Sequence, residues 1–130
     1  MAKKKYTVQK KIIKNAKTLK VRFYSYYQNN AGGSFRKPAE IIIIEAFNYK
    51  DANHRLQGID EMSFDSCDCC GDRWSYKNSW DEKEATIRPL LMDYNGKFVT
   101  ISTYLQSPKN HYRTVRVYYI NGRIEEYEKS

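Results

Sequence analysis

The chain has 130 residues and a formal net charge of +8, with 41% hydrophobic and 15% aromatic residues. This length fits one domain with a modest core, and no apolar run approaches the roughly 18 residues that a membrane-spanning helix needs. The N-terminus also lacks the apolar stretch of a secretory signal. We therefore expect a single domain over residues 1–130, with a basic tail at 1–5, kept in the cytosol and without a membrane partner.

The charge is distributed unevenly along the chain. Residues 1–39 contain eleven Lys or Arg and no acid, whereas the remainder contains twelve bases and fifteen acids. This asymmetry predicts an anionic partner, which is a nucleic acid, a nucleotide or an acidic protein surface. A solvated lysine face that protects an edge strand would also account for it.

Two strands are predicted at residues 6–14 and 18–28, joined as a hairpin by "NAKT". In the second strand, alternation places two sets of side chains on opposite faces. One set is Leu19, Val21, Phe23 and Tyr27, and the other is Lys20, Arg22, Tyr24 and Tyr26. The second set interleaves cations with rings, which suits single-stranded nucleic acid or a nucleotide: charge meets phosphate and ring meets base.

The loop that follows, "GGSFRKP", adds a second candidate contact with an anion. Gly32 and Gly33 let backbone N–H groups converge, and Arg36 and Lys37 supply charge. The loop is not a Walker A motif, and a glycine-rich hairpin loop needs no ligand to exist. The predicted ligand-binding residues are Lys20, Arg22, Tyr24, Tyr26, Gly33, Ser34, Arg36 and Lys37.

The rest of the chain predicts further strands and one helix. The run "EIIIIEAF" has the composition of a central strand covered on both faces. "NYKDANHRLQGI" predicts a short helix that is capped by Asn48 and ended by Gly58.

Beyond residue 85 the pattern predicts only strands. "FVTISTYL" alternates as a strand after an Asn95–Gly96 turn, and a hairpin around Asn121–Gly122 suits a type I′ turn. The predicted fold class is α+β, with a mostly antiparallel sheet of about five to seven strands and one short helix.

The stretch "DSCDCCGDRWS" holds all three cysteines of the chain. A zinc site needs four ligands, and Cys67, Cys70, His54 and His111 form one candidate set, with Cys69 as an alternative ligand. A redox pair or a Cys–His nucleophile lacks the expected surroundings. A packed turn, anchored in the core by Trp74, is the favoured interpretation, and structural zinc is the alternative.

The segments "EIIIIEAFNYKDANHRLQGID", "CDCCGDRW" and "VRVYYINGRIEEYE" resemble a family of small uncharacterised tailed-bacteriophage proteins with a C-x-C-C-G-x-R-W signature. The resemblance covers about residues 39–76 and is looser beyond them. It implies an accessory protein that acts in the cytoplasm of the infected bacterial host. It brings no catalytic residue and no cofactor.

These observations together predict a non-enzymatic protein that binds an anionic ligand through its basic and aromatic face. The ligand is a nucleic acid or a nucleotide, including a nucleotide signal of host defence. An inhibitor that docks on an acidic host protein is the alternative. A hydrolase or nuclease is the weaker alternative, because Asp65, Asp68 and Asp72 form the only local acidic cluster near the cysteines.

Overall fold

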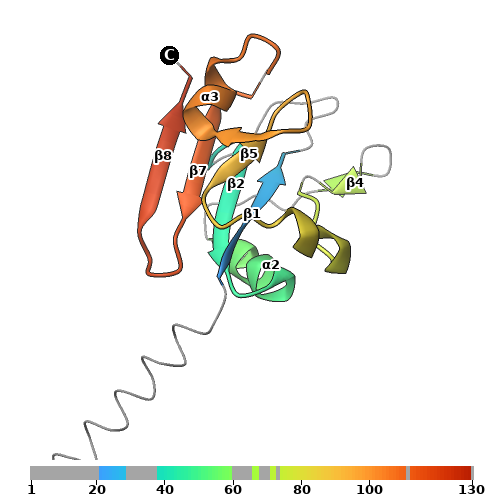
Figure 1. Cartoon of the computed structure of the whole chain (residues 1–130). Helices are drawn as coiled ribbons and strands as arrows, with labels where there is room; N and C mark the ends of the chain where they lie inside the picture. Colours follow the sequence, from blue (N-terminus) through green and yellow to red (C-terminus); the bar gives the residue numbers. More distant parts are fainter. Residues whose placement is uncertain are drawn as a thin grey trace, which may run out of the picture.

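A computed structural model describes residues 21–28, 38–59, 66–67, 71–72, 74–110 and 112–129, with the backbone alone for 66–67 and 71–72. Four strands form the main sheet in the order β1-β2-β7-β8 (Figure 1). These strands are β1 (Arg22–Tyr27), β2 (Ile41–Ala46), β7 (Thr114–Tyr118) and β8 (Ile124–Glu128). The two outer pairs are antiparallel, whereas β2 and β7 are parallel. The sheet is therefore mixed.

Two short ribbons accompany this sheet. One pairs β3 (Ser66–Cys67) with β4 (Gly71–Asp72), and the other pairs β5 (Leu90–Met92) with β6 (Phe98–Thr100). The α+β class is confirmed, but the expected main sheet of five to seven strands is wrong. Part of the expected strand sequence forms the separate β5–β6 ribbon, and residues 6–14 lie outside the described ranges.

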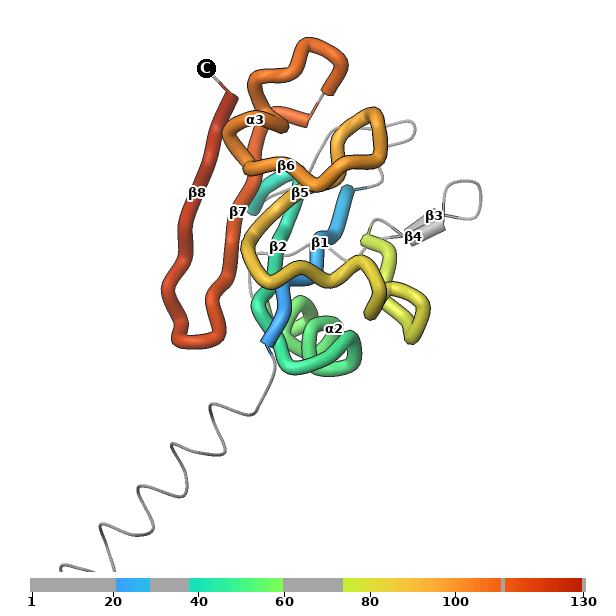
Figure 2. Tube along the Cα trace, in the orientation of Figure 1, coloured from blue at the N-terminus to red at the C-terminus, as the bar shows by residue number. Residues whose placement is uncertain are grey.

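Strand β2 is covered on both faces, as its unbroken apolar sequence predicted. Ile41 and Ile43 pack in a cluster with Leu91 of β5 and with the buried side chains of residues 101–105. Ile42 and Ile44 pack in a second cluster with the helix at residues 49–57. Figure 2 traces the elements that carry these clusters, with β5 and α3 near the upper end of β2 and α2 near its lower end. All four isoleucines are at most 1% exposed.

Helix α2 (Tyr49–Gln57) forms where the sequence predicted it. The Asn48 side chain accepts a hydrogen bond from the Asp51 N–H at 2.8 Å, which satisfies one free donor of the first turn. Gly58 ends the helix with φ −82°, so it needs no left-handed conformation. Ala52 and Leu56, one turn apart, are the residues that α2 buries.

The prediction of a single helix is wrong, because α3 (Ile101–Gln106) replaces an expected strand. The Thr100 side chain accepts from the Thr103 N–H and caps the helix. Ile101, Tyr104 and Leu105 are buried at the i, i+3, i+4 spacing of a helix. A 3-10 helix, η1 (Ser79–Glu84), begins at a capping box between Asn78 and Asp81. Within the described ranges, no helix is both long and apolar enough to cross a bilayer.

The β7–β8 hairpin is confirmed, but its turn is not type I′. A type I′ turn needs positive φ at both central residues, and among the described residues only Gly96 and Gly122 have positive φ, at 80° and 94°. The Gly122 N–H donates to the Tyr119 carbonyl at 2.9 Å, and the Tyr119 N–H donates to the Arg123 carbonyl at 2.8 Å. These bonds define a three-residue hairpin loop, residues 120–122, whose last residue has the left-handed conformation.

Candidate functional site

The structure buries two residues of the predicted binding face. Tyr24 and Tyr26 do share one face of β1, as the alternation predicted, but they are 2% and 1% exposed. Their rings pack in the cluster that contains Ala52 and Leu56 of α2. The expectation that these rings offer a free face to a base is therefore wrong, because α2 covers the face that β1 and β2 share.

The hydroxyls of both tyrosines are used within the protein. Tyr24 donates to a Glu82 carboxylate oxygen at 2.8 Å, and Tyr26 donates to the Asn53 side-chain oxygen at 2.8 Å. Burial raises the pKa of both phenols above their ordinary value, and the Glu82 carboxylate adds to the shift at Tyr24. Both tyrosines are therefore neutral hydrogen-bond donors to neighbouring side chains.

Of the other predicted ligand residues, only Arg22 lies among the described residues. Arg22 is half-buried, and its guanidinium donates to the Val21 carbonyl at 2.8 Å. The five that remain lie outside the described residues: Lys20, Gly33, Ser34, Arg36 and Lys37.

The predicted metal ligands are only partly described. His54 is exposed on α2, and Cys67 is described by its backbone in β3, while Cys69, Cys70 and His111 lie outside the described ranges. In the part of the chain that is described, no group of three His, Cys, Asp or Glu side chains could hold a metal ion. Zinc at this stretch remains a prediction.

Trp74 is 1% exposed and packs in the α2 cluster. Its burial is what the packed-turn interpretation of the cysteine stretch expected. Cys67 also pairs with Gly71 across the β3–β4 ribbon, so the backbone reverses direction between them.

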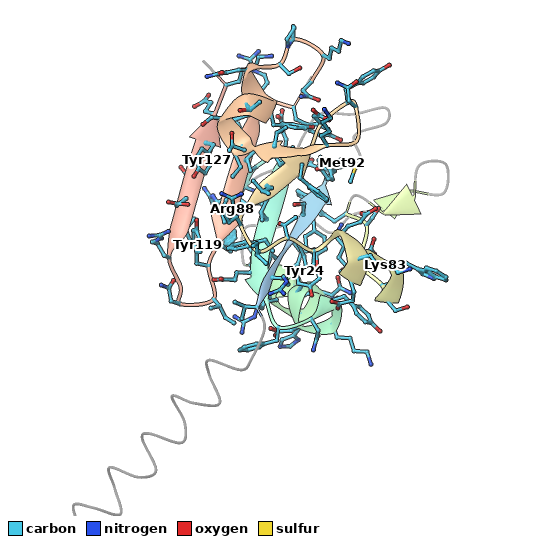
Figure 3. The ribbon with its side chains drawn as sticks, in the orientation of Figure 1. Tyr24, Lys83, Arg88, Met92, Tyr119 and Tyr127 are labelled. Carbon is cyan, nitrogen blue, oxygen red and sulfur yellow. The ribbon has the colours of Figure 1, made fainter. Side chains whose placement is uncertain are left out.

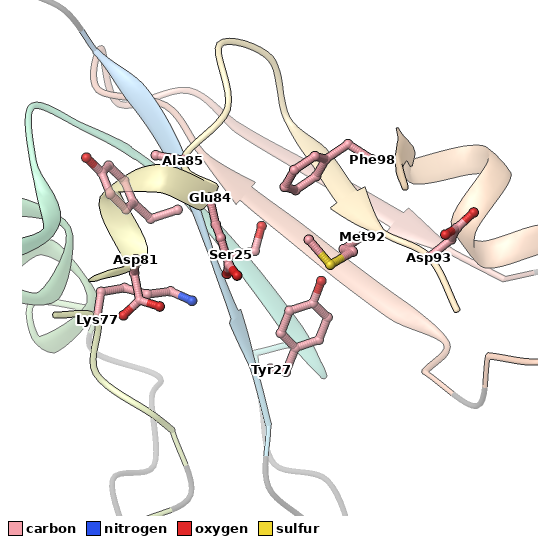
Figure 4. A pocket seen from close by; sticks show the side chains of 10 residues that line it. Ser25, Tyr27, Lys77, Asp81, Glu84, Ala85, Met92, Asp93 and Phe98 are labelled. Carbon is pink, nitrogen blue, oxygen red and sulfur yellow. The ribbon is translucent and has the colours of Figure 1, made fainter. Parts of the chain in front are cut away.

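A pocket of about 280 Å³ lies over β1, between η1 and the β5–β6 ribbon (Figure 4). The pairing of Phe23 with Thr86 brings the segment after η1 against the outer edge of β1, with N···O distances of 2.8 and 3.2 Å. The residues that line the pocket come from β1, from residues 77–85 and from residues 92–98. The lining residues are Tyr24, Ser25, Tyr27, Lys77, Asp81, Glu84, Ala85, Met92, Asp93 and Phe98.

Lys77 is the single cation of this pocket lining. Asn53 holds its backbone with two hydrogen bonds of 2.8 Å, and its Nζ lies 5.1 Å from the centre of the Tyr26 ring. Burial lowers the pKa of the Lys77 amine, and the nearby Asp81 and Glu84 carboxylates partly offset this effect. The amine is thus held in a partly dry site beside two acids.

The β1 and β5–β6 sides of the pocket are mainly apolar. Burial raises the pKa of Tyr27 to about 12, so its phenol is neutral at physiological pH. Phe98, which is 42% exposed, and its cross-strand partner Met92 on β5 line this side of the pocket (Figure 4). A flat apolar group entering here meets a ring and a thioether.

Two exposed aromatic rings stand next in sequence to the acids of this pocket. Trp80 on η1 is 76% exposed and lies 5.8 Å from the Lys83 amine, and Figure 3 marks Lys83 at this side of the molecule. Tyr94, in the β5–β6 turn, is 74% exposed and lies 5.0 Å from the Lys109 amine. Both rings are therefore exposed and have a lysine amine within cation–π distance.

Sequence reasoning missed this pocket. The segment "KNSWDEKE" is polar and has no spacing that marks a site. The asparagine three residues before Asp81 is a readable capping signal. No local pattern reveals that η1 then faces β5 across β1.

The end of the sheet where residues 29–37 connect β1 to β2 carries several cations. Arg113 and Lys129 flank the paired ends of β7 and β8, and Lys109 lies in the preceding loop. The Glu40 carboxylate at this end accepts hydrogen bonds from the N–H groups of Arg113 and Thr114. One acid at this end is therefore already engaged with backbone donors.

The family profile of a domain of unknown function, DUF7296, matches residues 21–130. The chain belongs to this family. No curated protein and no solved structure matches it. The DUF7296 match begins at Val21, so residues 1–20, with eight of the lysines, lie before the matched region.

Proposed function

We propose that this protein binds a nucleic acid or a nucleotide, and that phosphate contacts from the two basic segments that precede and follow β1 in the sequence supply most of the affinity. The observation that carries the proposal is the placement of charge. Residues 1–20 hold eight lysines and no acid and join β1 at its start, and the acid-free residues 29–37 join it at its end. In the sequence, the edge strand β1 therefore has a basic segment before it and another after it.

The described body adds cations near one end of β1. Lys109 and Arg113 are exposed, and the β5–β6 turn contributes Lys97. Tyr27 at this end pairs with Ile41, and its ring lies 5.8 Å from that of Tyr112, which precedes Arg113. Cations and rings on one surface are the arrangement that single-stranded nucleic acid uses.

The burial of Tyr24 and Tyr26 changes which aromatic rings are proposed to contact a base. Tyr24 and Tyr26 are core residues, so ring contacts with a base are assigned to exposed rings instead. Trp80, Tyr94 and Phe98 are each more than 40% exposed; Phe98 lines the pocket, and Trp80 and Tyr94 are adjacent in sequence to the lining residues Asp81 and Asp93. The basic segments then contribute charge, and these rings contribute stacking.

The resemblance to tailed-phage proteins supports a role as an accessory protein in the cytoplasm of an infected bacterium. Such a protein can act by sequestering or covering its ligand, without turnover. An acidic host protein is the competing partner, because it would also attract a basic face.

Fluorescence anisotropy with labelled single-stranded DNA and RNA of about 20 nucleotides tests the proposal. If about five phosphates are neutralised, the affinity falls about a hundredfold between 50 and 200 mM salt. A protein that binds neither polynucleotide at 50 mM salt does not have this function, and the inhibitor alternative then takes its place.

Matched charge variants locate the contacts. We expect Arg36→Gln/Lys37→Gln and Lys10→Gln/Lys11→Gln each to weaken binding and to lower the salt dependence. The control is Lys50→Gln/Arg88→Gln, which removes two exposed cations from the described body outside the proposed contact. Equal losses in all three variants would show attraction by net charge alone and would contradict a defined site.

A further inference from the structure

The pocket over β1 combines an apolar floor with groups that accept and donate hydrogen bonds. Tyr27, Met92 and Phe98 provide the flat apolar surface. Lys77 provides a donor, and Glu84 provides an acceptor on the same side as Lys77 (Figure 4). A ligand that fills this space therefore needs a flat body with both kinds of polar group on its edge.

The polar groups of the pocket differ in how many hydrogen bonds they already form within the protein. Asp93 accepts from the N–H groups of Asn95 and Lys97, each at 2.9 Å, and Asp81 accepts from the Asn78 N–H at 2.7 Å. Among the described residues, no hydrogen bond or ion pair engages the Glu84 side chain, and no carboxylate lies within 4.0 Å of the Lys77 amine. Within this part of the chain, the Glu84 carboxylate and the Lys77 amine therefore keep hydrogen-bonding capacity for a ligand.

The mixture of charges excludes the simplest ligands. A phosphate would face the carboxylates of Asp81, Glu84 and Asp93 at short range, which is unfavourable. An organic cation would be attracted by these carboxylates but would also meet the Lys77 amine, which lines the same pocket. A neutral heterocycle with donors and an acceptor avoids both repulsions.

We propose that this pocket binds a single unpaired guanine base. The guanine edge carries the O6 acceptor beside the N1–H and N2–H donors. Lys77 donates to O6, while the two carboxylate oxygens of Glu84 accept from N1–H and N2–H as a bidentate pair. The ring lies against Phe98 and Met92. Adenine, cytosine and uracil lack two adjacent donors next to an acceptor.

This inference rests on the proposed function and names the base that it prefers. The pocket floor is β1, and the basic segments join both ends of that strand. A bound single strand can thus use the two basic segments, which adjoin β1 in the sequence, for phosphate contacts and the pocket for one base. Single strands are recognised in this way, by stacking and by reading the edges of splayed bases.

Guanosine, which has no phosphate, tests the pocket apart from the basic segments. We expect guanosine to shift the NMR signals of the Met92 methyl group and the Phe98 ring, while adenosine, cytidine and uridine leave them in place. Agmatine is added as a probe cation. Shifts with agmatine and none with guanosine would overturn the inference in favour of a cation site.

Oligonucleotides give the second measurement. A 12-mer that contains guanines should bind about tenfold more tightly than one of equal length without guanine, which is the lower part of the range for one bidentate base contact. Glu84→Gln should abolish this preference and leave the salt dependence unchanged. Glu128→Gln removes an equally exposed carboxylate outside the pocket and serves as the matched control.

The outcomes separate the two proposals. Salt-dependent binding without base preference, and without guanosine shifts, would sink the guanine pocket and leave the proposed function standing. Guanosine binding without any salt-dependent affinity for oligonucleotides would contradict the proposed function and leave the guanine pocket standing. Phe98→Leu, a substitution at an exposed ring, gives a second test: it should weaken guanosine binding while the thermal unfolding midpoint stays within a few degrees.

Discussion

Asn53 on α2 holds the backbone of Lys77 at both of its polar groups. The Asn53 amide donates to the Lys77 carbonyl, and its oxygen accepts from the Lys77 N–H, each at 2.8 Å. The same oxygen accepts from the Tyr26 hydroxyl at 2.8 Å. One side chain therefore joins α2, β1 and the wall of the pocket.

Loss of this side chain should destabilise the fold. Asn53→Ala leaves the part-buried groups of Lys77 and Tyr26 without a partner, so we expect a loss of about 1–3 kcal/mol in the free energy of unfolding. Asn53→Asp retains the acceptor and loses the donor, so its cost should be intermediate. Urea denaturation measures both. Gln57→Ala, at an exposed position of the same helix, is the control, and an equal cost there would refute the role of Asn53.

The two-sided burial of β2 predicts similar costs on both faces. Ile42→Ala and Ile43→Ala each remove a fully buried side chain, from the α2 cluster and from the α3 cluster, and each should cost about 2–5 kcal/mol. Ile124→Ala, at a position that is 52% exposed, should cost far less. Chemical denaturation of the three variants checks the pattern. A small effect at one of the two buried positions would mean that its face is not packed.

The β7–β8 turn depends on one left-handed residue. Gly122 has φ 94°, and nothing lies within 4 Å of where its Cβ would be, so Gly122→Ala costs conformational energy without a clash. We expect a loss of about 1–2 kcal/mol. Gly122→Asn should cost less, because asparagine tolerates this region better. Thermal unfolding compares the two variants. Equal stability of Gly122→Ala and the unaltered protein would contradict the turn described here.

Buried phenols should make the protein sensitive to alkali. Burial raises the pKa of Tyr27 to about 12, and it raises the pKa of Tyr24 and Tyr26 as well. The unfolded phenol has a pKa of about 10. The neutral form is thus favoured in the folded state, so stability holds below about pH 10 and falls as the pH rises from about 10 toward 12. Denaturation midpoints measured at pH 8, 9.5 and 11 test this.

Two variants test which side chains cause the change in stability at high pH. Tyr27→Phe should reduce the fall in stability above pH 10, since one raised phenol is removed. Lys77 acts in the opposite sense: burial lowers the pKa of its amine, so its charged form costs stability, and this cost disappears as the pH rises. Lys77→Met should therefore steepen the net fall. A midpoint of Lys77→Met that does not change between pH 9.5 and pH 11 would contradict both assignments, because no Lys77 effect then offsets that of the phenols.

Local sequence patterns correctly predicted α2, β2 and the β7–β8 hairpin. Asn48 and Gly58 bound α2, the isoleucine run predicts a strand buried on both faces, and Asn121–Gly122 predicts a reversal. The alternation in residues 98–105 led to the wrong prediction of a strand there, because the spacing of Ile101, Tyr104 and Leu105 also fits a helix. The helical spacing of these apolar residues was readable, but the choice between the two periods was decided by their packing in one cluster with Leu91, Val115 and Val117.

The sequence by itself determined the charge of residues 1–39, the absence of acids there and the strand periodicity of β1. Only the tertiary structure decided that α2 covers Tyr24 and Tyr26, because alternation defines two faces and does not say which is buried. It also decided that Lys77 and Glu84 meet Met92 and Phe98 over β1. Those contacts join segments far apart in the chain, and no local propensity encodes such a meeting.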